Sequence, residues 1–261
     1  MANIIAICNQ KGGVGKTTTT ISLGSYLAAF GRKTLIVDFD PQANATSGLG
    51  IDYAKLTKNL YHNLVFGFSL EDTIQHTPLF GLDILPSSPE LIGAQVELNC
   101  FQGKEYRLKE LLNYIKSQYQ YILIDLPPSL GLLTVNGLVA AEYVLIPIQT
   151  EFFALDGLAQ LINTVDLIRR NLDEDLKILG AVLTLYDRRN RLDRLVVKNI
   201  LRHFPGYVFN AIIPRNVSLA EAPSFGQSIL QYAPNSEGAR SYRQLAEELI
   251  RKLEHGQSIF R

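Results

Sequence analysis

The sequence is poor in cysteine, has no excess of either charge and contains no long hydrophobic run. Its two cysteines, Cys8 and Cys100, offer no spacing for a metal-binding knuckle or a disulfide framework. Cys8 lies in an apolar run, so we expect a small buried residue there. No stretch reaches the roughly 18 consecutive apolar residues that span a bilayer, and no transmembrane helix is predicted.

The charges balance: 25 basic residues face 25 acidic ones, and the formal net charge is +0. The molecule as a whole therefore does not attract nucleic acid, and any such binding has to come from a local basic patch. With 47% hydrophobic and 19% charged residues, the composition is that of a folded protein rather than a disordered one. The apolar run near the N-terminus is short and follows no basic segment, so we predict no signal peptide and expect a cytoplasmic protein.

Short apolar runs alternate with longer helical patterns along the chain. Candidate strands cover residues 4–8, 34–38, 82–85, 121–125, 143–148, 178–185 and 208–213, and candidate helices cover residues 17–30, 89–101, 104–118, 132–141, 155–171, 194–204 and 236–253. Strands that are apolar throughout are buried on both faces, which indicates a parallel sheet between helical layers. We predict one α/β domain over residues 1–261, with a mostly parallel twisted sheet, helices on both faces and the last helix packed on the domain. Residues 51–81 are the least regular, and we expect an insertion or mobile segment there.

Residues 10–18 read Gln-Lys-Gly-Gly-Val-Gly-Lys-Thr-Thr, between a predicted strand and a predicted helix, which is the context of a phosphate-binding loop. Glycines let the backbone wrap around phosphate oxygens, and the amides at the helix N-terminus attract anions. Lys16 can then reach the β- and γ-phosphates and the Thr17 hydroxyl can bind Mg²⁺, so ATP with Mg²⁺ is the predicted ligand. The alternative is a glycine-rich turn that merely caps the helix. The predicted nucleotide contacts are Lys11, Gly12, Gly13, Val14, Gly15, Lys16, Thr17 and Thr18.

Three aspartates follow predicted strands. Asp38 and Asp40 lie in the run Asp-Phe-Asp-Pro-Gln at the end of the second strand, and Asp125 ends the strand 121–125. Ligands bind at the carboxyl edge of a parallel sheet. Asp40 is therefore a candidate for orienting or deprotonating an attacking water, and Asp38 and Asp125 are candidates for the Mg²⁺ site. In the alternative interpretation, Asp40 and Pro41 simply start a turn.

The phosphate loop departs from the plain G-x-x-x-x-G-K-T pattern, because Gln10 stands at the first glycine position and Lys11 follows directly. It resembles the deviant K-G-G-x-G-K-T motif of the ParA/MinD group of ATPases, whose second and third motifs match the runs that contain Asp40 and Asp125. In that family the extra lysine reaches across a dimer interface to the partner's nucleotide. The resemblance implies an ATP-sandwich homodimer, with Lys11 acting beside Lys16 and Asp40 in catalysis and Asp125 holding Mg²⁺ through a water.

Later segments look like the chromosomal ParA type, often called Soj. They are the run Glu-Phe-Phe-Ala-Leu-Asp-Gly-Leu at 151–158, Ile-Pro-Arg-Asn at 213–216, Ala-Glu-Ala-Pro-Ser at 220–224 and Gly-Ala at 238–239. Residues that match Pro214 and Asn216 contact adenine in that family, so both are carried over as ATP contacts. The resemblance covers nearly the whole chain. It implies a slow ATPase of chromosome or plasmid partitioning, stimulated by a ParB-like centromere-binding partner.

A run of basic residues lies near position 190. Arg191, Arg194 and Lys198, with Arg202, share one face of a predicted helix, whereas Leu195, Val196, Ile200 and Leu201 fall elsewhere and are expected to pack. Such a stripe can neutralise several phosphates, although a solvated helix face is the ordinary alternative. In ParA-like proteins the ATP dimer binds double-stranded DNA without sequence preference, and Arg189 matches a basic position implicated there. The resemblance therefore implies nucleoid association through Arg189, Arg191, Arg194 and Lys198, while Ser218 stands where many relatives carry a second arginine.

Two rival interpretations come from the same group of ATPases. A MinD-like positioning ATPase carries a C-terminal amphipathic membrane anchor, but here Leu245, Leu249 and Leu253 form a stripe typical of core packing. The tail after the last helix has few apolar residues, so no stable membrane association is expected. An iron–sulfur or reductase relative needs a pair of interface cysteines, which Cys8 inside the first strand cannot provide.

Overall fold

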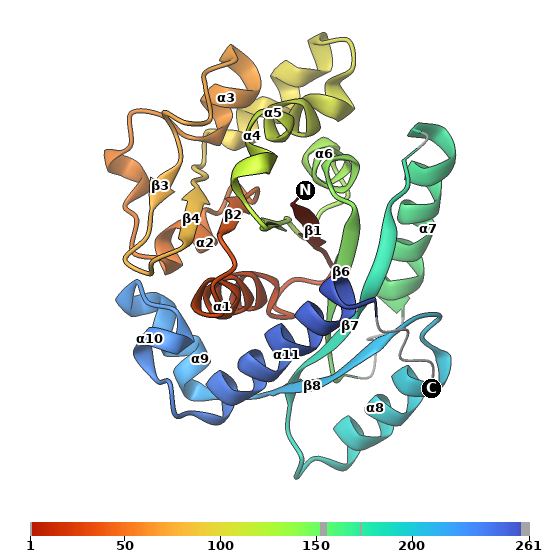
Figure 1. The fold of residues 1–261 in the computed structure, drawn as a ribbon. Helices are drawn as coiled ribbons and strands as arrows, with labels where there is room; N and C mark the ends of the chain where they lie inside the picture. The colour runs from red at the N-terminus through yellow and green to blue at the C-terminus, as the bar shows by residue number, and fades with distance from the viewer. Residues whose placement is uncertain (1, 152–155, 173, 257–261) are drawn as a thin grey trace.

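The computed structural model describes residues 2–151, 156–172 and 174–256. In these ranges the strands form one sheet with the order β3-β4-β2-β5-β1-β6-β7-β8 (Figure 1). Neighbouring strands run parallel, except that β3 pairs with β4 in the antiparallel sense. The strands are β1 (Asn3–Ile7), β2 (Thr34–Asp38), β3 (Gln75–His76), β4 (Leu82–Leu85), β5 (Tyr121–Asp125), β6 (Tyr143–Gln149), β7 (Lys177–Tyr186) and β8 (Val208–Pro214). The predicted α/β fold with a mostly parallel sheet is confirmed.

The central strands are buried on both faces and divide the core into two halves. Ile4 and Ala6 of β1 point into one half, whereas Ile5 and Ile7 point into the other. Every residue of β2 and β5 is buried. Apolar strands without alternation therefore mark a sheet between two helical layers, as the sequence predicts.

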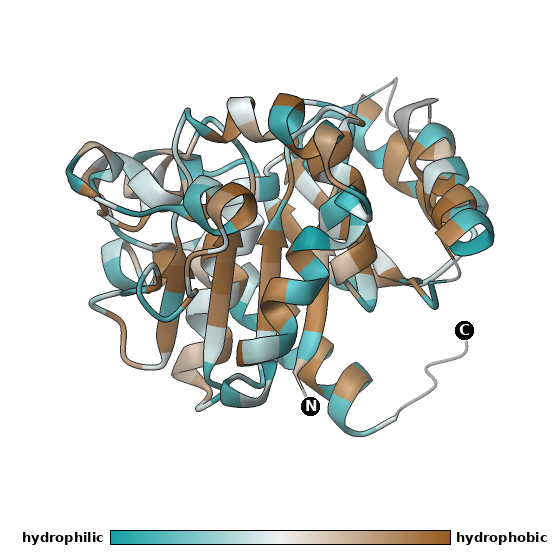
Figure 2. Ribbon diagram, turned by 90° about the horizontal axis from the view of Figure 1, so that it is seen from above, coloured by the Kyte–Doolittle hydropathy of each residue, from teal (hydrophilic) through white to brown (hydrophobic). Residues whose placement is uncertain are grey.

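Helices cover both faces of the sheet (Figure 1), and hydrophobic residues concentrate on the strands between them (Figure 2). The half of the core that contains Ile5 is closed by α1 (Lys16–Ala29), α2 (Asn44–Gly48), α9 (Val217–Glu221), α10 (Ile229–Tyr232) and α11 (Glu237–Glu254). The half that contains Ile4 is closed by α3 (Leu60–Phe66), α4 (Leu91–Glu97), α5 (Arg107–Ile115), α6 (Leu132–Ala140), α7 (Asp156–Leu172) and α8 (Arg191–His203). Short 3-10 turns are η1 (Tyr53–Lys55), η2 (Leu98–Cys100), η3 (Lys104–Tyr106), η4 (Lys116–Gln118) and η5 (Ala222–Phe225).

The predicted elements differ from the observed ones mainly at their ends. The helix expected over 194–204 begins at Arg191, because the Asn190 side chain accepts a hydrogen bond from the Leu192 amide and caps the helix there. The patterns over 89–101 and 104–118 are each split into an α-helix and 3-10 turns. Leu155, the expected start of the helix over 155–171, lies outside the described residues, and α7 runs from Asp156.

The last helix packs on the sheet. Ser236 caps α11 by accepting a hydrogen bond from the Ala239 amide. Leu245 and Leu249 are fully buried in the half of the core that contains Ile5, and α11 packs against β8 and α1. Leu245 and Leu249 are therefore part of the core and not available to another surface, whereas Leu253, the third leucine of the stripe, is only partly buried.

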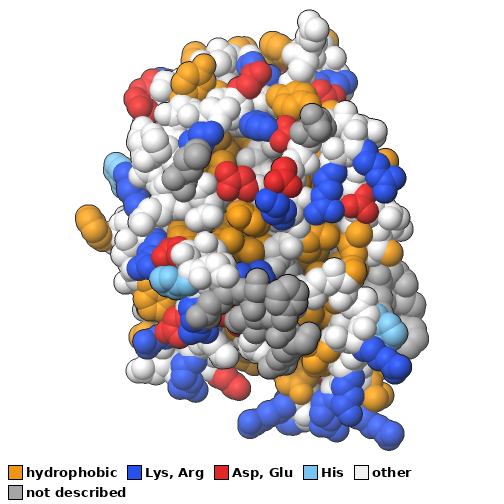
Figure 3. Space-filling model, turned by 45° about the vertical axis from the view of Figure 1, so that its right-hand side comes forward, with side chains coloured by type: hydrophobic (Ala, Val, Ile, Leu, Met, Phe, Trp, Pro, Cys, Tyr) orange, Lys and Arg blue, Asp and Glu red, His pale blue; other side chains and the backbone are white. Residues whose placement is uncertain are grey.

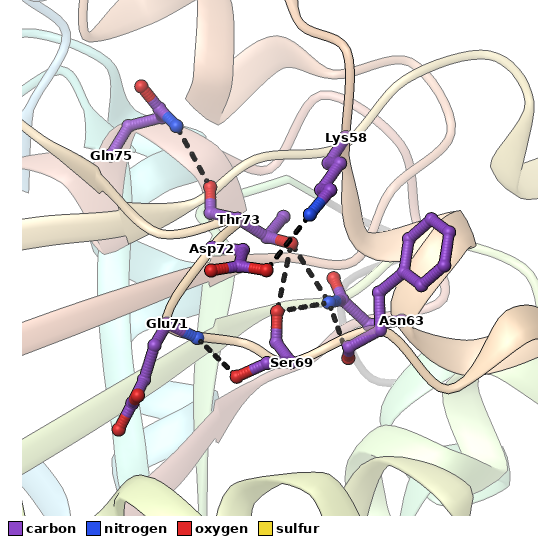
Figure 4. Close-up of polar contacts among 8 residues, drawn as sticks. Lys58, Asn63, Ser69, Glu71, Asp72, Thr73 and Gln75 are labelled. Carbon is purple, nitrogen blue, oxygen red and sulfur yellow. Dashed lines mark hydrogen bonds and ion pairs between the residues drawn. The ribbon is translucent and has the colours of Figure 1, made fainter.

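The segment 51–81 is more regular than the sequence predicts, because it contains η1, α3 and β3. Asn59 caps α3, and the Asn63 side-chain amide is buried. This amide donates hydrogen bonds to the Thr73 hydroxyl (2.9 Å) and to the Ser69 carbonyl (3.1 Å), as Figure 4 shows. Buried polar contacts of this kind tie the segment together. The structure thus has regular elements at residues 60–66 and 75–76, and the expected insertion or mobile segment stays a prediction.

The chain after β2 lies directly against the chain after β8. Gly50 and Gly226 both have positive φ angles, 80° and 64°, which favour glycine. A Cβ atom on Gly226 would lie 2.6 Å from the Cα of Gly50, so the two backbones touch. At Gly48 a Cβ atom would come within 2.8 Å of the Ile21 side chain, so α2 also packs closely on α1.

Candidate functional site

The glycine-rich loop lies at the carboxyl edge of the sheet, between β1 and α1. Gly13 and Gly15 have φ angles of 74° and 84°, a region that other residues enter only with strain. Open space surrounds both Gly12 and Gly13, where an added Cβ would meet no atom of the chain within 4 Å. The loop therefore has the backbone shape and the open concave side that a phosphate group needs, with the N-terminus of α1 facing it.

Hydrogen bonds made by the side chains of Thr184 and Asn9, which the sequence pattern does not reveal, hold this loop in place. The Thr184 hydroxyl at the end of β7 donates to the Val14 carbonyl at 2.8 Å. The Asn9 side chain donates to the Pro147 carbonyl at 2.7 Å and accepts from the Lys11 amide at 3.0 Å. The bonds to Val14 and Pro147 join residues far apart in sequence, so local patterns give no signal for them.

Lys16 begins α1 and is only 7% exposed. Its Nζ lies 3.4 Å from the Lys11 carbonyl oxygen. Burial lowers the pKa of this ammonium, while the nearby charges of Asp125 and Asp40 act in the opposite direction. A cation that has lost much of its hydration in this way interacts strongly with an anion that enters the loop.

Thr17 and Asp125 meet beneath the loop, as the sequence pattern predicts for a Mg²⁺ site. The Thr17 hydroxyl donates to Asp125 Oδ2 at 2.7 Å, and the Thr20 hydroxyl donates to Oδ1 at 3.1 Å. Burial raises the pKa of Asp125 to about 6, although both hydroxyls and Lys16 favour the ionised form. Thr20, one helical turn after Lys16, is a further partner that the sequence pattern does not reveal.

These groups fit Mg²⁺ with a nucleotide. Mg²⁺ binds oxygen ligands, keeps several waters and takes the rest from one or two carboxylates and the substrate phosphates. Thr17 and Asp125 offer such oxygens beside the open side of the glycine loop. Within the described ranges no group of three or more His, Cys, Asp or Glu side chains could hold a metal by itself, so an all-protein cage is not the pattern seen here.

Asp38 and Asp125 are register partners at the ends of β2 and β5. Asp38 is fully buried, and its Oδ2 accepts hydrogen bonds from the Thr46 amide (2.8 Å) and hydroxyl (2.6 Å). Burial, followed by repulsion from Asp125, raises the pKa of Asp38 to about 7. Its role in the Mg²⁺ shell stays a prediction.

Asp40 is 9% exposed at the same edge. Its carbonyl accepts from the Ala43 amide at 2.9 Å, and its Oδ1 accepts from the Gln42 amide at 2.9 Å. Asp40 does start a turn, and that turn places its carboxylate at the ligand edge. The turn and the catalytic interpretation are therefore compatible.

Lys11 forms an ion pair within its own chain. Its Nζ lies 2.5 Å from Glu151 Oε2, and both side chains are about two-fifths to one-half exposed, 39% and 48%. Glu151 follows β6 and opens the segment in which residues 152–155 lie outside the described ranges. Glu151 belongs to the family-like run at 151–158, but that run gives no sign of this contact, which a single chain can form without a partner.

Pro214 and Asn216, the predicted adenine contacts, close β8 and open α9. Asn216 Oδ1 accepts a hydrogen bond from the Leu219 amide at 3.3 Å and caps α9. The segment continues into η5, which lies on α2 through the contact of Gly226 with Gly50. The chain that follows Asn216 thus reaches α2 through η5 and Gly226.

The basic residues at 189–198 lie on or next to α8, at the lower edge of the molecule, where Lys and Arg side chains gather in Figure 3. Asp193 fixes α8 to the sheet by accepting from the Thr150 hydroxyl (2.9 Å) and the Asp187 amide (2.8 Å). Arg189 is paired with Asp187 at 2.8 Å, and hydrogen bonds from Arg189 lower the pKa of that carboxyl to about 2. Exposed along the helix are Arg191, Arg194 and Lys198.

The apolar side of α8 is narrower than predicted. Val196 and Ile200 are buried, as expected, but Leu195 and Leu201 are each 54% exposed. The buried stripe has the spacing 193, 196 and 200, and both leucines lie outside it. Their predicted packing is therefore wrong, and they flank the basic face.

No helix in the described part of the chain is long and apolar enough to cross a membrane.

Known proteins with similar sequences include ATPases of chromosome partitioning and match nearly the whole chain. A family model described as an AAA domain matches residues 2–178. The chain is 49% identical over 249 residues to the sporulation initiation inhibitor protein Soj of Bacillus subtilis (strain 168), which covers 95% of this chain and 98% of that protein. It is 46% identical over 252 residues to the chromosome partitioning protein ParA of Myxococcus xanthus (strain DK1622), with 97% and 89% covered.

Two solved structures with the same fold contain nucleotide and magnesium. Cobyrinic acid a,c-diamide synthase from Mycobacterium smegmatis, with a bound ATP analog and magnesium, is similar with a TM-score of 0.87 and 35% identity over 98% of each chain. The septum site-determining protein MinD from Pyrococcus horikoshii, complexed with Mg-ADP, gives a TM-score of 0.79 and 28% identity over 99% of this chain and 100% of that one.

Proposed function

The chain belongs to the family of Soj and ParA chromosome partitioning proteins, and on this premise we propose that it is a Mg²⁺-dependent ATPase whose nucleotide state controls its dimerisation and its binding to DNA. One observation carries the proposal: Thr17 and Asp125 are hydrogen-bonded at 2.7 Å directly below an open glycine loop that Lys16 flanks. A nucleoside triphosphate with Mg²⁺ requires this arrangement of groups. We also propose that residues 1–261 act as a single P-loop domain.

The phosphate loop binds and orients the nucleotide. Lys16 contacts the β- and γ-phosphates, and the backbone amides from Gly12 to Thr18 surround their oxygens. Thr17 and Asp125 would hold Mg²⁺, which would neutralise part of the phosphate charge. Asp38, register partner of Asp125, supports this shell from the neighbouring strand.

Asp40 holds the attacking water and accepts its proton. Two observations support this role: Asp40 follows β2 at the carboxyl edge of the sheet, and its charge acts on Lys16 of the phosphate loop. Little covalent chemistry falls to the protein in phosphoryl transfer, so placement of this one carboxylate has a large effect on rate. Turnover is slow as long as no partner completes the site.

Lys11 acts between two copies of the chain. When two ATP-bound subunits meet, Lys11 leaves Glu151 and reaches the partner's phosphates, which makes the dimer depend on ATP. Pro214 and Asn216 contact adenine at the other end of the nucleotide.

The ATP dimer binds double-stranded DNA without sequence preference through Arg189, Arg191, Arg194 and Lys198. Two copies of the α8 surface, brought together by dimerisation, contact more phosphates than one copy does. A ParB-like centromere-binding protein stimulates hydrolysis and releases the dimer. The protein is then cytoplasmic, and associated with the nucleoid when it holds ATP.

A MinD-like membrane role is the second candidate, favoured by the structural similarity to MinD over nearly the whole chain. The burial of Leu245 and Leu249 argues against it, because the last helix cannot pack in the core and insert into a membrane at the same time.

DNA retention by the Asp40→Ala variant tests the proposal. Retention is measured with ATP, with ADP and without nucleotide across a salt series, with Lys16→Ala as the control that binds no nucleotide productively. We expect retention with ATP alone, weakening steeply with salt because counterions compete for the phosphates. Retention in no state, with dimerisation intact, would reject DNA as the partner and make liposomes the next test.

Charge reversal identifies the surface. Arg189→Glu with Arg194→Glu should abolish retention, whereas Arg243→Glu on α11, a similarly exposed arginine paired with Glu247, should leave it unchanged. For every DNA phosphate that a variant no longer neutralises, the slope of log affinity against log salt becomes shallower by about 0.9. Equal retention by the two variants would exclude α8 as the DNA surface.

A further inference from the structure

A buried chain of hydrogen bonds links the end of β2, α2 and the loop after β4. Asp38 Oδ2 accepts from the Thr46 hydroxyl at 2.6 Å, and the same hydroxyl oxygen accepts from the Ser87 amide at 3.0 Å. The Ser87 hydroxyl donates to the Asp40 carbonyl at 2.8 Å. Asp38, Thr46 and Ser87 are all fully buried, so water cannot take over these bonds.

The turn that this chain of bonds spans has a strained conformation. Ala43 has φ 52° and ψ 33°, the left-handed region that residues with a Cβ enter rarely. Such a conformation persists only where the surroundings hold it in place. Thr46 holds the far side of the turn to Asp38, and Ser87 holds its near side at Asp40.

The hydroxyls of Thr46 and Ser87 both form hydrogen bonds to residues that flank this turn. Thr46 donates to a carboxylate and accepts from an amide, so its hydroxyl connects the end of β2 to the loop after β4. Ser87 fixes the main chain of Asp40 itself. The Asp40 carboxylate is in turn held by the Gln42 amide of the same turn, which donates to its Oδ1 at 2.9 Å.

We propose that Thr46 and Ser87 are positioning residues for hydrolysis: they hold the strained turn so that the Asp40 carboxylate points at the attacking water. The inference rests on the proposed ATPase function, of which it describes one further part. Neither residue contacts the nucleotide in this scheme, and Asp38 of the Mg²⁺ shell keeps its hydrogen bond from the Thr46 amide (2.8 Å) when the hydroxyl is lost. Loss of the hydroxyls therefore slows the hydrolytic step far more than it weakens ATP binding. Displacement of a reacting group by about 1 Å costs on the order of 100-fold in rate.

The test compares Thr46→Val, which keeps the shape of the side chain without its hydroxyl, with Thr46→Ser, which restores the hydroxyl. Ser87→Ala removes only the bond to the Asp40 carbonyl and serves if Thr46→Val does not fold. The matched control is Thr73→Val, because Thr73 is an equally buried threonine whose hydroxyl donates to Ser69 and accepts from Asn63, away from the site (Figure 4). Thermal unfolding is recorded for every variant.

Single-turnover hydrolysis and equilibrium binding of a fluorescent ATP analogue with Mg²⁺ separate the two effects. We expect hydrolysis to fall by about 10- to 100-fold in Thr46→Val and Ser87→Ala, with affinity within about threefold of the parent chain. Thr46→Ser should recover most of the rate. Thr73→Val should lose a similar amount of thermal stability but hydrolyse ATP at the parent rate.

Two failures are distinguishable. If the parent chain binds or hydrolyses no ATP, the proposed function itself is wrong, and the inference falls with it before any variant is compared. If the parent chain hydrolyses ATP but Thr46→Val and Ser87→Ala keep the rate of Thr73→Val, or lose affinity in step with rate, the positioning role alone is wrong.

Discussion

Replacement of Leu249 by alanine tests whether the last helix, α11, packs in the core. Its side chain is fully buried, in the half of the core that also contains Ile5, and α11 packs there against β8 and α1. Leu253 lies one turn further along the same stripe and is only partly buried. Leu249→Ala therefore removes side-chain carbons from closed packing, and Leu253→Ala removes the same atoms from a site that water already reaches.

The free energy of unfolding should separate the two variants. A fully buried leucine replaced by alanine costs about 3–5 kcal/mol, from lost transfer energy and the cavity left behind. We expect about 3 kcal/mol or more for Leu249→Ala and about 1 kcal/mol for Leu253→Ala. Urea denaturation followed by circular dichroism measures both. At a slope of about 3 kcal/mol per molar, the midpoint falls by about 1 M and about 0.3 M, respectively.

Equal, small losses in the two variants would refute the packing argument. The stripe would then face solvent or lipid, and the membrane role would regain support. Flotation with anionic liposomes in the presence of ATP provides the second readout, since an anchor built from this stripe loses binding when Leu249 is shortened. We expect no ATP-dependent flotation of the parent chain.

Three further predictions concern the carboxyl edge of the sheet. Glu151→Gln frees Lys11 in both subunits and should tighten the ATP-dependent dimer in sedimentation. The gain should be no more than about 30-fold, or about fivefold per subunit, because a half-exposed ion pair contributes about 1 kcal/mol at most. A weaker dimer would mean that Glu151 itself contacts the partner. Gly12→Val should admit nucleotide but lower the dimer fraction in crosslinking. Its side chain enters the open space in front of the loop, where the second subunit is expected to approach. Dimerisation equal to that of the parent would contradict this. A disulfide-exchange reagent at pH 8 should modify only the exposed Cys100 until the chain unfolds. Cys8, directly after β1, is buried, and burial raises the pKa of its thiol to about 12. Rapid modification of both thiols would show that the first strand is open.

Much of the fold could be predicted because the strands are apolar throughout. The bounds of β2, β4 and β5 follow from the sequence to the residue, since each is a short apolar run between polar turns. By contrast, β3 is only two residues long and pairs antiparallel at the sheet edge, so it produces no periodicity to detect. The exposure of Leu195 and Leu201 was likewise missed, because helical spacing gives the width of an apolar stripe only approximately.

The candidate site could be predicted where its chemistry is local in sequence. Lys16 and Thr17 belong to one short motif, and Asp125 ends a recognisable strand. Thr184 and Ser87 could not be predicted, because the hydroxyl of each meets the site through a hydrogen bond to a main-chain carbonyl over a long sequence separation. Serine and threonine are common in loops, so their type carries no signal without the fold.

The main chains at Gly50 and Gly226 are in direct contact, with no side chain between them. Side chains that meet in a core can change rotamer and absorb a displacement, but two main chains in direct contact cannot. A displacement of the segment after α2, which follows the Asp40 turn, is therefore expected to displace the segment at Gly226 as well. A side chain at either glycine would push the two main chains apart, because a Cβ on Gly226 would lie 2.6 Å from the Cα of Gly50 and a Cβ on Gly50 would lie 3.1 Å from the Gly226 carbonyl oxygen.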